Sequence, residues 1–281
     1  AASDVYKRQI LIFGLFGVPK MGIQGAAAAT VFGQIVAMFL ALILNHSKNK
    51  EVRINFRSFT PNWRTISIIY QVGVPSIIMQ SISSVMTFGM NKILIGFSET
   101  AVAVFGVYFK LQSFIFMPIF GLNNGMIPIV AYNYGARSKK RIMETVWLSI
   151  GIAVGIMLIG LMVFHLMTPQ LLMLFQADEE MLAIGVPALR IISLSFLFAG
   201  YCIIVGSVFQ ALGNGVYSLI ISVARQLVCI LPLAWFFART FGLHAVWLSL
   251  PLAEITSVVL SSILFRKIYL DKIKPLGQAA A

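Results

Sequence analysis

Residues 146–167 read VWLSIGIAVGIMLIGLMVFHLM, and this stretch decides the class of fold. It contains no Asp, Glu, Lys or Arg from Val146 to Met167. A helix needs roughly 20 predominantly apolar residues to cross about 30 Å of hydrocarbon. The stretch therefore predicts a helix that spans a lipid bilayer.

Similar apolar stretches recur on both sides of it and predict about seven transmembrane helices. The predicted spans are 21–44, 66–97, 101–132, 146–167, 182–212, 215–238 and 243–265. Strands of a membrane barrel would be about ten residues long and would alternate polar and apolar side chains, a pattern that is absent here. The sequence thus predicts an all-α integral membrane protein.

Composition and charge agree with a membrane environment. The chain is 59% hydrophobic and 11% charged, whereas ordinary soluble domains carry about 25% charged residues. The formal net charge of +12 could indicate nucleic-acid binding. Because nearly all basic residues lie in short gaps between apolar stretches, we expect membrane lipids and no nucleic acid as partners. Cys202 and Cys229 lie inside apolar stretches and indicate neither a disulfide nor a metal site.

The basic residues alternate between successive loops, which predicts the orientation. Lys and Arg are frequent in 45–64, in 133–141 and after residue 265. The loop 98–100 has neither, and 168–181 carries only acidic charges. Because basic loops stay on the cytoplasmic side, we expect a multi-pass protein of the cell membrane with a cytoplasmic C-terminus.

A weak internal repeat relates the first predicted span to the last. Aligning Gly22–Ala26 with Gly242–Val246 places Gln34 opposite Glu254. Parallel repeats of this kind are typical of secondary transporters. We interpret residues 1–9 as a non-native leader, 10–44 as the end of a first lobe, 45–65 as a cytoplasmic basic linker and 66–274 as a second six-helix lobe. The rest of the first lobe is expected to be missing upstream.

Three charged residues lie deep inside predicted spans. Glu254, Arg225 and Lys110 each lie about ten residues into their span, near the bilayer midplane at 1.5 Å per residue. A central charge costs about 2.5–3.5 kcal/mol on insertion scales, so each needs a reason. A binding cavity is one interpretation, and a structural Arg225–Glu254 ion pair is the other.

Amide side chains also lie within the spans. Gln80, Asn91, Gln210 and Gln226 lie on polar helix faces, and their bulk favours a cavity over tight packing. Glycines at Gly121 and Gly125, and at Gly151 and Gly155, have the spacing of close helix–helix packing, which is what we expect there.

Signatures of an enzyme are missing from the sequence. His46, His165, His244 and one midplane carboxylate form no recognisable catalytic or metal-binding pattern. There is no phosphate-binding P-loop. We expect a protein that is not an enzyme, needs no cofactor and depends on an ion gradient or a partner for any transport.

Several motifs together resemble the multidrug and toxic compound extrusion (MATE) family. The second predicted lobe carries them at Gly73–Ser76, Phe105–Phe114, Gly121–Pro128, Asn133–Ala136, Gln210–Gly215 and Arg225–Gln226, and the first lobe at Gly22–Thr30. The resemblance implies part of a twelve-helix transporter made of two six-helix lobes. It implies an antiporter that exports small organic, often cationic and amphipathic, drug-like or toxic compounds by alternating access, in exchange for H⁺ or Na⁺.

The resemblance also implies roles for particular residues. It places a cation-site Thr at Thr30, leaves Glu254 as the second-lobe carboxylate able to titrate, and adds the motif residues Gln112 and Asn123 to the cavity. Some relatives carry a Glu where this chain has Ser83, which argues against a Na⁺ site of that type. The predicted cavity residues are Gln80, Asn91, Lys110, Gln112, Asn123, Gln210, Arg225 and Glu254, and the predicted coupling-ion residues are Thr30 and Glu254.

Two other functions remain open at this point. A flippase for lipid-linked oligosaccharides has a related architecture, and its anionic substrate would suit Lys110 and Arg225. A membrane scaffold without transport activity would instead bury Arg225 and Glu254 as a pair, with no cavity beside them.

Overall fold

The computed structural model describes residues 22–48 and 60–277. Helices are the only regular secondary structure among these residues. The chain divides after Trp63 into two units, which we describe separately. The predicted leader at 1–9, the apolar residues 10–18 and most of the basic linker lie outside the described residues.

The first unit contributes one long helix, α2, from Gly22 to Lys48. Its apolar part, Ala27–Lys48, is long and hydrophobic enough to cross a membrane. Thr30 lies on this helix.

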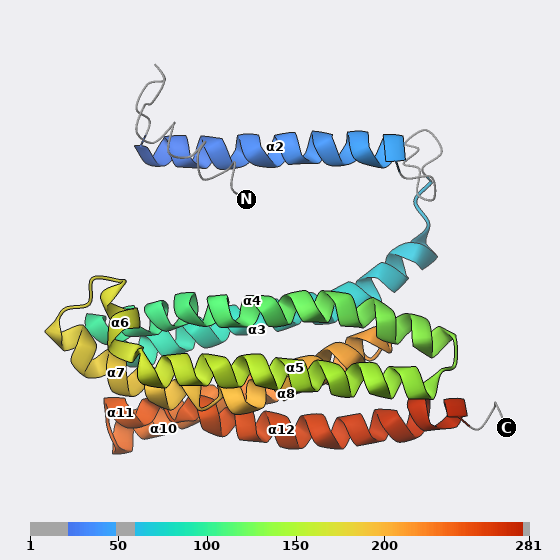
Figure 1. Cartoon of the computed structure of the whole chain (residues 1–281). Helices are drawn as coiled ribbons and strands as arrows, with labels where there is room; N and C mark the ends of the chain where they lie inside the picture. The colour runs from blue at the N-terminus through green and yellow to red at the C-terminus, as the bar shows by residue number, and fades with distance from the viewer. Residues whose placement is uncertain (1–21, 49–59, 278–281) are drawn as a thin grey trace. The chain divides into compact units, whose positions relative to one another are not determined.

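The second unit is a helical bundle (Figure 1). Its helices are α3 (Trp63–Leu94), α4 (Glu99–Gly135), α5 (Lys139–Leu166), α6 (Thr168–Met173), α7 (Glu179–Ser193), α8 (Phe196–Ala211), α9 (Gly215–Val223), the π-helix η3 (Ala224–Ile230), α10 (Leu231–Thr240), α11 (Leu243–Val246), α12 (Ser249–Ile268), the π-helix η4 (Tyr269–Ile273) and the 3₁₀-helix η5 (Lys274–Gly277). Across the described parts of both units, six helices could cross a membrane, or seven if the bent pair α7–α8 counts as one span. The predicted all-α membrane fold is confirmed.

One predicted span differs in shape from a single helix. The stretch 182–212 is broken between Ser193 and Phe196, and α7 and α8 meet at a bend of 48°. The hydroxyl of Ser195 donates a hydrogen bond to the carbonyl of Ile192 at 2.7 Å. The backbone N–H of Ser195 donates to the same carbonyl at 3.0 Å, so hydrogen bonds continue through the bend, which is a requirement inside a membrane.

Aromatic side chains form much of the core between α4, α5 and α8, which pack against one another. The ring of Phe196 meets Phe164 edge-on at 5.2 Å and Phe116 at 5.6 Å between centroids. Large apolar side chains such as Phe88 and Phe114 are instead more than 70% exposed in this unit. Exposed apolar surface on this scale fits a lipid environment.

Close helix packing occurs at glycines other than the predicted ones. A Cβ atom added at Gly121, Gly125, Gly151 or Gly155 would meet nothing within 4 Å among the residues described, so the prediction of close packing there is wrong for this unit. A Cβ at Gly200 of α8 would instead lie 3.1 Å from the carbonyl oxygen of Ala153 on α5. Glycine spacing marks a helix face but does not tell which face meets a neighbour.

Candidate functional site

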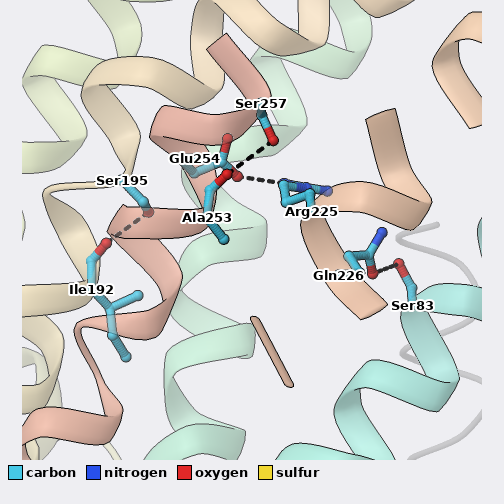
Figure 2. A network of polar contacts seen from close by, with 8 residues as sticks. All are labelled: Ser83, Ile192, Ser195, Arg225, Gln226, Ala253, Glu254 and Ser257. Atoms are coloured by element: carbon cyan, nitrogen blue, oxygen red, sulfur yellow. Dashed lines mark hydrogen bonds and ion pairs between the residues drawn. The ribbon is translucent and has the colours of Figure 1, made fainter. Parts of the chain in front are cut away.

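A π-helical segment places two successive polar residues against two different helices. In η3, Arg225 Nη1 donates to Glu254 Oε1 on α12 at 2.5 Å. The next residue, Gln226, accepts a hydrogen bond from the hydroxyl of Ser83 on α3 at 3.0 Å. Figure 2 shows both contacts side by side. Short π-helical segments inside α-helices are frequent at functional sites.

The Arg225–Glu254 pair is unevenly buried. The side chain of Arg225 is 34% exposed, whereas that of Glu254 is 8% exposed. Glu254 Oε2 has no hydrogen-bond partner among the residues described. The carboxylate therefore lies inside the bundle, and the guanidinium lies between it and an open space.

That open space is a cavity of about 510 Å³ within the second unit. It lies between α3, α4, α8, α9, η3 and α12. Its lining residues are Met79, Gln80, Phe120, Asn123, Asn124, Ile127, Ala199, Cys202, Ile203, Gly206, Ser207, Gln210, Ser218, Ile221, Ser222, Arg225 and Ser257. The bundle thus contains a partly open cavity whose wall mixes polar and apolar side chains.

Three serine hydroxyls of the wall donate hydrogen bonds to backbone carbonyls. Ser207 donates to the carbonyl of Ile203 at 3.0 Å, and Ser218 to that of Gly206 at 2.7 Å. Ser257 donates to the carbonyl of Ala253 at 3.2 Å. Each hydroxyl oxygen keeps lone pairs that can accept a hydrogen bond. Asn123 Oδ1, a further acceptor, is buried and has no partner in the described part of the chain.

Four of the predicted cavity residues meet in this cavity, and Glu254 lies directly behind it. The four are Gln80, Asn123, Gln210 and Arg225. They come from α3, α4, α8 and η3, so residues distant in sequence share one wall.

The other predicted residues lie elsewhere. Asn91, Lys110 and Gln112 do not line this cavity. At 1.5 Å per residue, Asn91 lies about 16 Å along α3 from Gln80, and Lys110 lies about 20 Å along α4 from Asn123. The ammonium of Lys110 is 5.5 Å from the ring centroid of Phe175. A shared helix face does not imply a shared depth in the bilayer.

The structure changes the interpretation of three further residues. Gln226 does not line the cavity, because its side chain is buried against Ser83. Cys202 and Asn124 do line it, although neither was predicted as a site residue. Asn124 directly follows Asn123 in the sequence, and this position could have indicated that it also lines the cavity. The sequence around Cys202 did not indicate a cavity residue, since cysteine in an apolar stretch usually acts as a small hydrophobic residue.

Within residues 22–48 and 60–277, no three His, Cys, Asp or Glu side chains are grouped so that they could hold a metal ion. The polar groups of the cavity are one guanidinium, several amides, hydroxyls and a thiol. This set can bind by hydrogen bonding and charge, but it offers no pair of acids or nucleophile–base arrangement.

Comparison with known proteins identifies related membrane proteins. Residues 75–236 match the sequence model of the family described as MatE. The chain is 27% identical over 245 residues to "Multidrug export protein MepA" of Staphylococcus haemolyticus (strain JCSC1435), which covers 87% of this chain and 53% of the relative. It is also 27% identical over 248 residues to the protein of the same name from Staphylococcus aureus (strain bovine RF122 / ET3-1), with the same coverage. The chain thus spans about half the length of the curated relatives that it matches.

Solved structures agree with the sequence comparison. One is described as "Outward-facing conformation of a multidrug resistance MATE family transporter of the MOP superfamily". The match has a TM-score of 0.85 and 26% sequence identity, and it covers 98% of this chain and 60% of that chain.

Proposed function

Because the chain belongs to the MatE family, we propose that it takes part in the export of small organic compounds across the cell membrane, in exchange for H⁺ or Na⁺. Its relatives are named as multidrug export proteins and transporters, not as enzymes. These names favour an exporter over a flippase or a scaffold. The matches cover 53% and 60% of these relatives' own lengths, so we also propose that a further helical lobe completes the transport path with α3–α12.

The observation that carries the proposal is the polar cavity inside an apolar membrane bundle. Polar groups are costly within a bilayer and are retained where they line a water-filled path or bind a substrate. The volume of about 510 Å³ lies in the range of pockets that hold drug-sized ligands, roughly 300–1,000 Å³.

Glu254 is the proposed coupling residue of the second lobe. A proton on this carboxylate would remove its charge and leave the guanidinium of Arg225 without a counter-ion. Because an uncompensated charge is costly there, the contact between α12 and η3 would have to change. Protonation could in this way favour one of two conformations, as alternating access requires. Thr30 on α2 is the other proposed coupling residue.

The test is transport by the complete gene product reconstituted into vesicles. Efflux of ethidium, a cation, and of carboxyfluorescein, an anion, is followed in separate experiments while a pH gradient or a Na⁺ gradient is imposed. We expect one of the two gradients to drive efflux, and Glu254→Gln to reduce that efflux when it is compared at equal amounts of folded protein. Arg190→Gln is the control, because Arg190 is an exposed side chain on α7.

Each outcome has a clear meaning. Efflux that neither gradient changes would contradict coupled export and would favour the scaffold. Unchanged coupled efflux in Glu254→Gln would remove Glu254 from the coupling site and leave Thr30 as the proposed residue.

A further inference from the structure

The cavity presents a positive charge and hides the matching negative one. Arg225 is the one charged side chain among its described lining residues, and Glu254 is not part of the lining. The exposed fractions of 34% and 8% describe the same asymmetry. A ligand in the cavity therefore meets the guanidinium before it meets the carboxylate.

The guanidinium has capacity for a second partner. It carries five N–H donors, and within the described chain the structure gives it a hydrogen bond to Glu254 through Nη1. Arg binds planar carboxylate groups in a two-point geometry that few other side chains can offer. An acceptor group on a ligand could thus bind Arg225 while the ion pair stays intact.

The rest of the wall offers acceptor oxygens as well as the N–H donors of its amides. Ser207, Ser218 and Ser257 use their hydrogens on backbone carbonyls, and Asn123 Oδ1 has no partner in the described residues. Buried acceptors without a donor are unfavourable, so a ligand that supplies hydrogen-bond donors is stabilised here. The cavity therefore suits a molecule that combines an anionic acceptor with neutral donors.

Building on the proposed function, we propose that this cavity binds compounds carrying a carboxylate together with hydrogen-bond donors, and that Arg225 anchors the carboxylate. Organic cations bind poorly at this site, because their charge would face the guanidinium in a medium of low dielectric constant. Arg225 thereby determines which class of compound the second lobe accepts.

Two native cysteines provide a direct measurement of binding. Cys202 lines the cavity, whereas Cys229 lies outside it, so the second thiol is an internal control. The purified complete gene product is treated with N-ethylmaleimide, and alkylation of each cysteine is quantified by mass spectrometry. The probes are salicylate, its neutral amide salicylamide, and benzyltrimethylammonium, a cation of similar size.

We expect salicylate to slow alkylation of Cys202 at concentrations that leave Cys229 unaffected. Salicylamide should need about a tenfold higher concentration or more, the factor expected for loss of a hydrogen bond between charged groups. Benzyltrimethylammonium should protect least. Protection by the cation equal to that by salicylate would overturn the proposal, as would the absence of any protection of Cys202 by salicylate.

Variants then test the anchoring role. Arg225→Gln with Glu254→Gln removes both charges together and should abolish the advantage of salicylate over salicylamide. Arg225→Lys keeps the charge but loses the planar fork, so the advantage should shrink but remain. The control Arg190→Gln should behave like the unaltered protein. An advantage that survives in the double variant would show that Arg225 is not the anchor.

This experiment is independent of the transport assay. Protection of Cys202 that depends on Arg225, without any coupled efflux, would support the site and contradict the proposed function. Coupled efflux without protection by salicylate would support the proposed function and contradict the proposed carboxylate site.

Discussion

The ion pair between Arg225 and Glu254 is the residue-level feature with the largest energetic consequence. Removing one partner leaves the other charge buried, which typically costs about 3–5 kcal/mol, whereas replacing both by apolar residues is often neutral. Because Arg225 is 34% exposed, we expect Arg225→Leu to destabilise by about 3 kcal/mol, the lower end of that range. Arg225→Leu with Glu254→Leu should recover most of the loss, measured as thermal unfolding in detergent.

The double variant is the control for this prediction. If both proteins unfold at the same temperature as the unaltered protein, the two charges do not depend on each other. If the double variant is no more stable than Arg225→Leu, the loss comes from packing and not from the unpaired carboxylate.

The hydrogen bond between Ser83 and Gln226 links α3 to η3. Gln226 is 3% exposed, so Ser83→Ala would leave its Oε1 without this donor. The expected cost is about 1–3 kcal/mol, the penalty for an unsatisfied buried polar atom. Ser84→Ala is the matched control, since Ser84 is an exposed neighbour on the same helix. Equal unfolding temperatures for the two variants would mean that the bond contributes nothing.

The position of a residue along its helix was predictable from the sequence, but its contacts were not. Counting residues from the span ends placed Arg225 and Glu254 near the midplane, and the ion pair was one of two interpretations. The count also placed Lys110 there, yet Lys110 lies beside Phe175. Sequence distance measures position along one helix. Which side chains of other helices lie opposite depends on helix rotation and crossing, and no local pattern encodes these.

At the scale of helices, the contact between α5 and α8 depends on one glycine. A side chain at Gly200 would approach the Ala153 carbonyl at 3.1 Å and Met157 Cγ at 3.2 Å. Backbone atoms cannot move aside as a flexible side chain can, so Gly200→Ala should push the helices apart and cost about 1–3 kcal/mol, as overpacking does. Thermal unfolding of the purified protein measures this.

Gly155→Ala on the partner helix is the control. A Cβ there meets nothing within 4 Å in the described residues, and alanine favours helix by about 1 kcal/mol over glycine. We expect this variant to be as stable as the unaltered protein or more stable. A loss at Gly155 equal to that at Gly200 would contradict the assignment of the α5–α8 contact to Gly200.

The existence of the helices was predictable because hydrocarbon thickness fixes their minimum length. The residues at which the helices begin and end were harder to predict. The helix α5 begins at Lys139 rather than at 146, because a helix can continue into the polar region where hydropathy no longer marks it. The break at Leu194 and Ser195 and the π-helical segment at Arg225 also left no signal. The π-helical segment depends on contacts of Arg225 and Gln226 with α12 and α3, which lie far away in the sequence.

For the whole molecule, one end of the second unit is basic and carries tyrosines. Lys139 lies 5.4 Å from the ring centroid of Tyr269, and Lys267 lies 5.9 Å from that of Tyr217. The segment before α7 has the opposite charge, with Asp178 capping the helix and Glu179 and Glu180 in its first turn. Aromatic and basic residues gather at membrane interfaces, and basic loops remain in the cytoplasm. We therefore propose that the end of α4 at Ala136 faces the cytoplasm.

Introduced cysteines can test this orientation in cells that produce the complete gene product. Ala136→Cys and Glu180→Cys place thiols at exposed positions in the basic and acidic segments. We expect a membrane-impermeant maleimide to label Glu180→Cys in intact cells and Ala136→Cys only after permeabilisation. Cys202 and Cys229 lie within predicted spans, and labelling of the unaltered complete gene product sets the background. Labelling of Ala136→Cys in intact cells, with Glu180→Cys protected, would contradict this orientation. The end of α4 would then face the outside of the cell, and the start of α7 would face the cytoplasm.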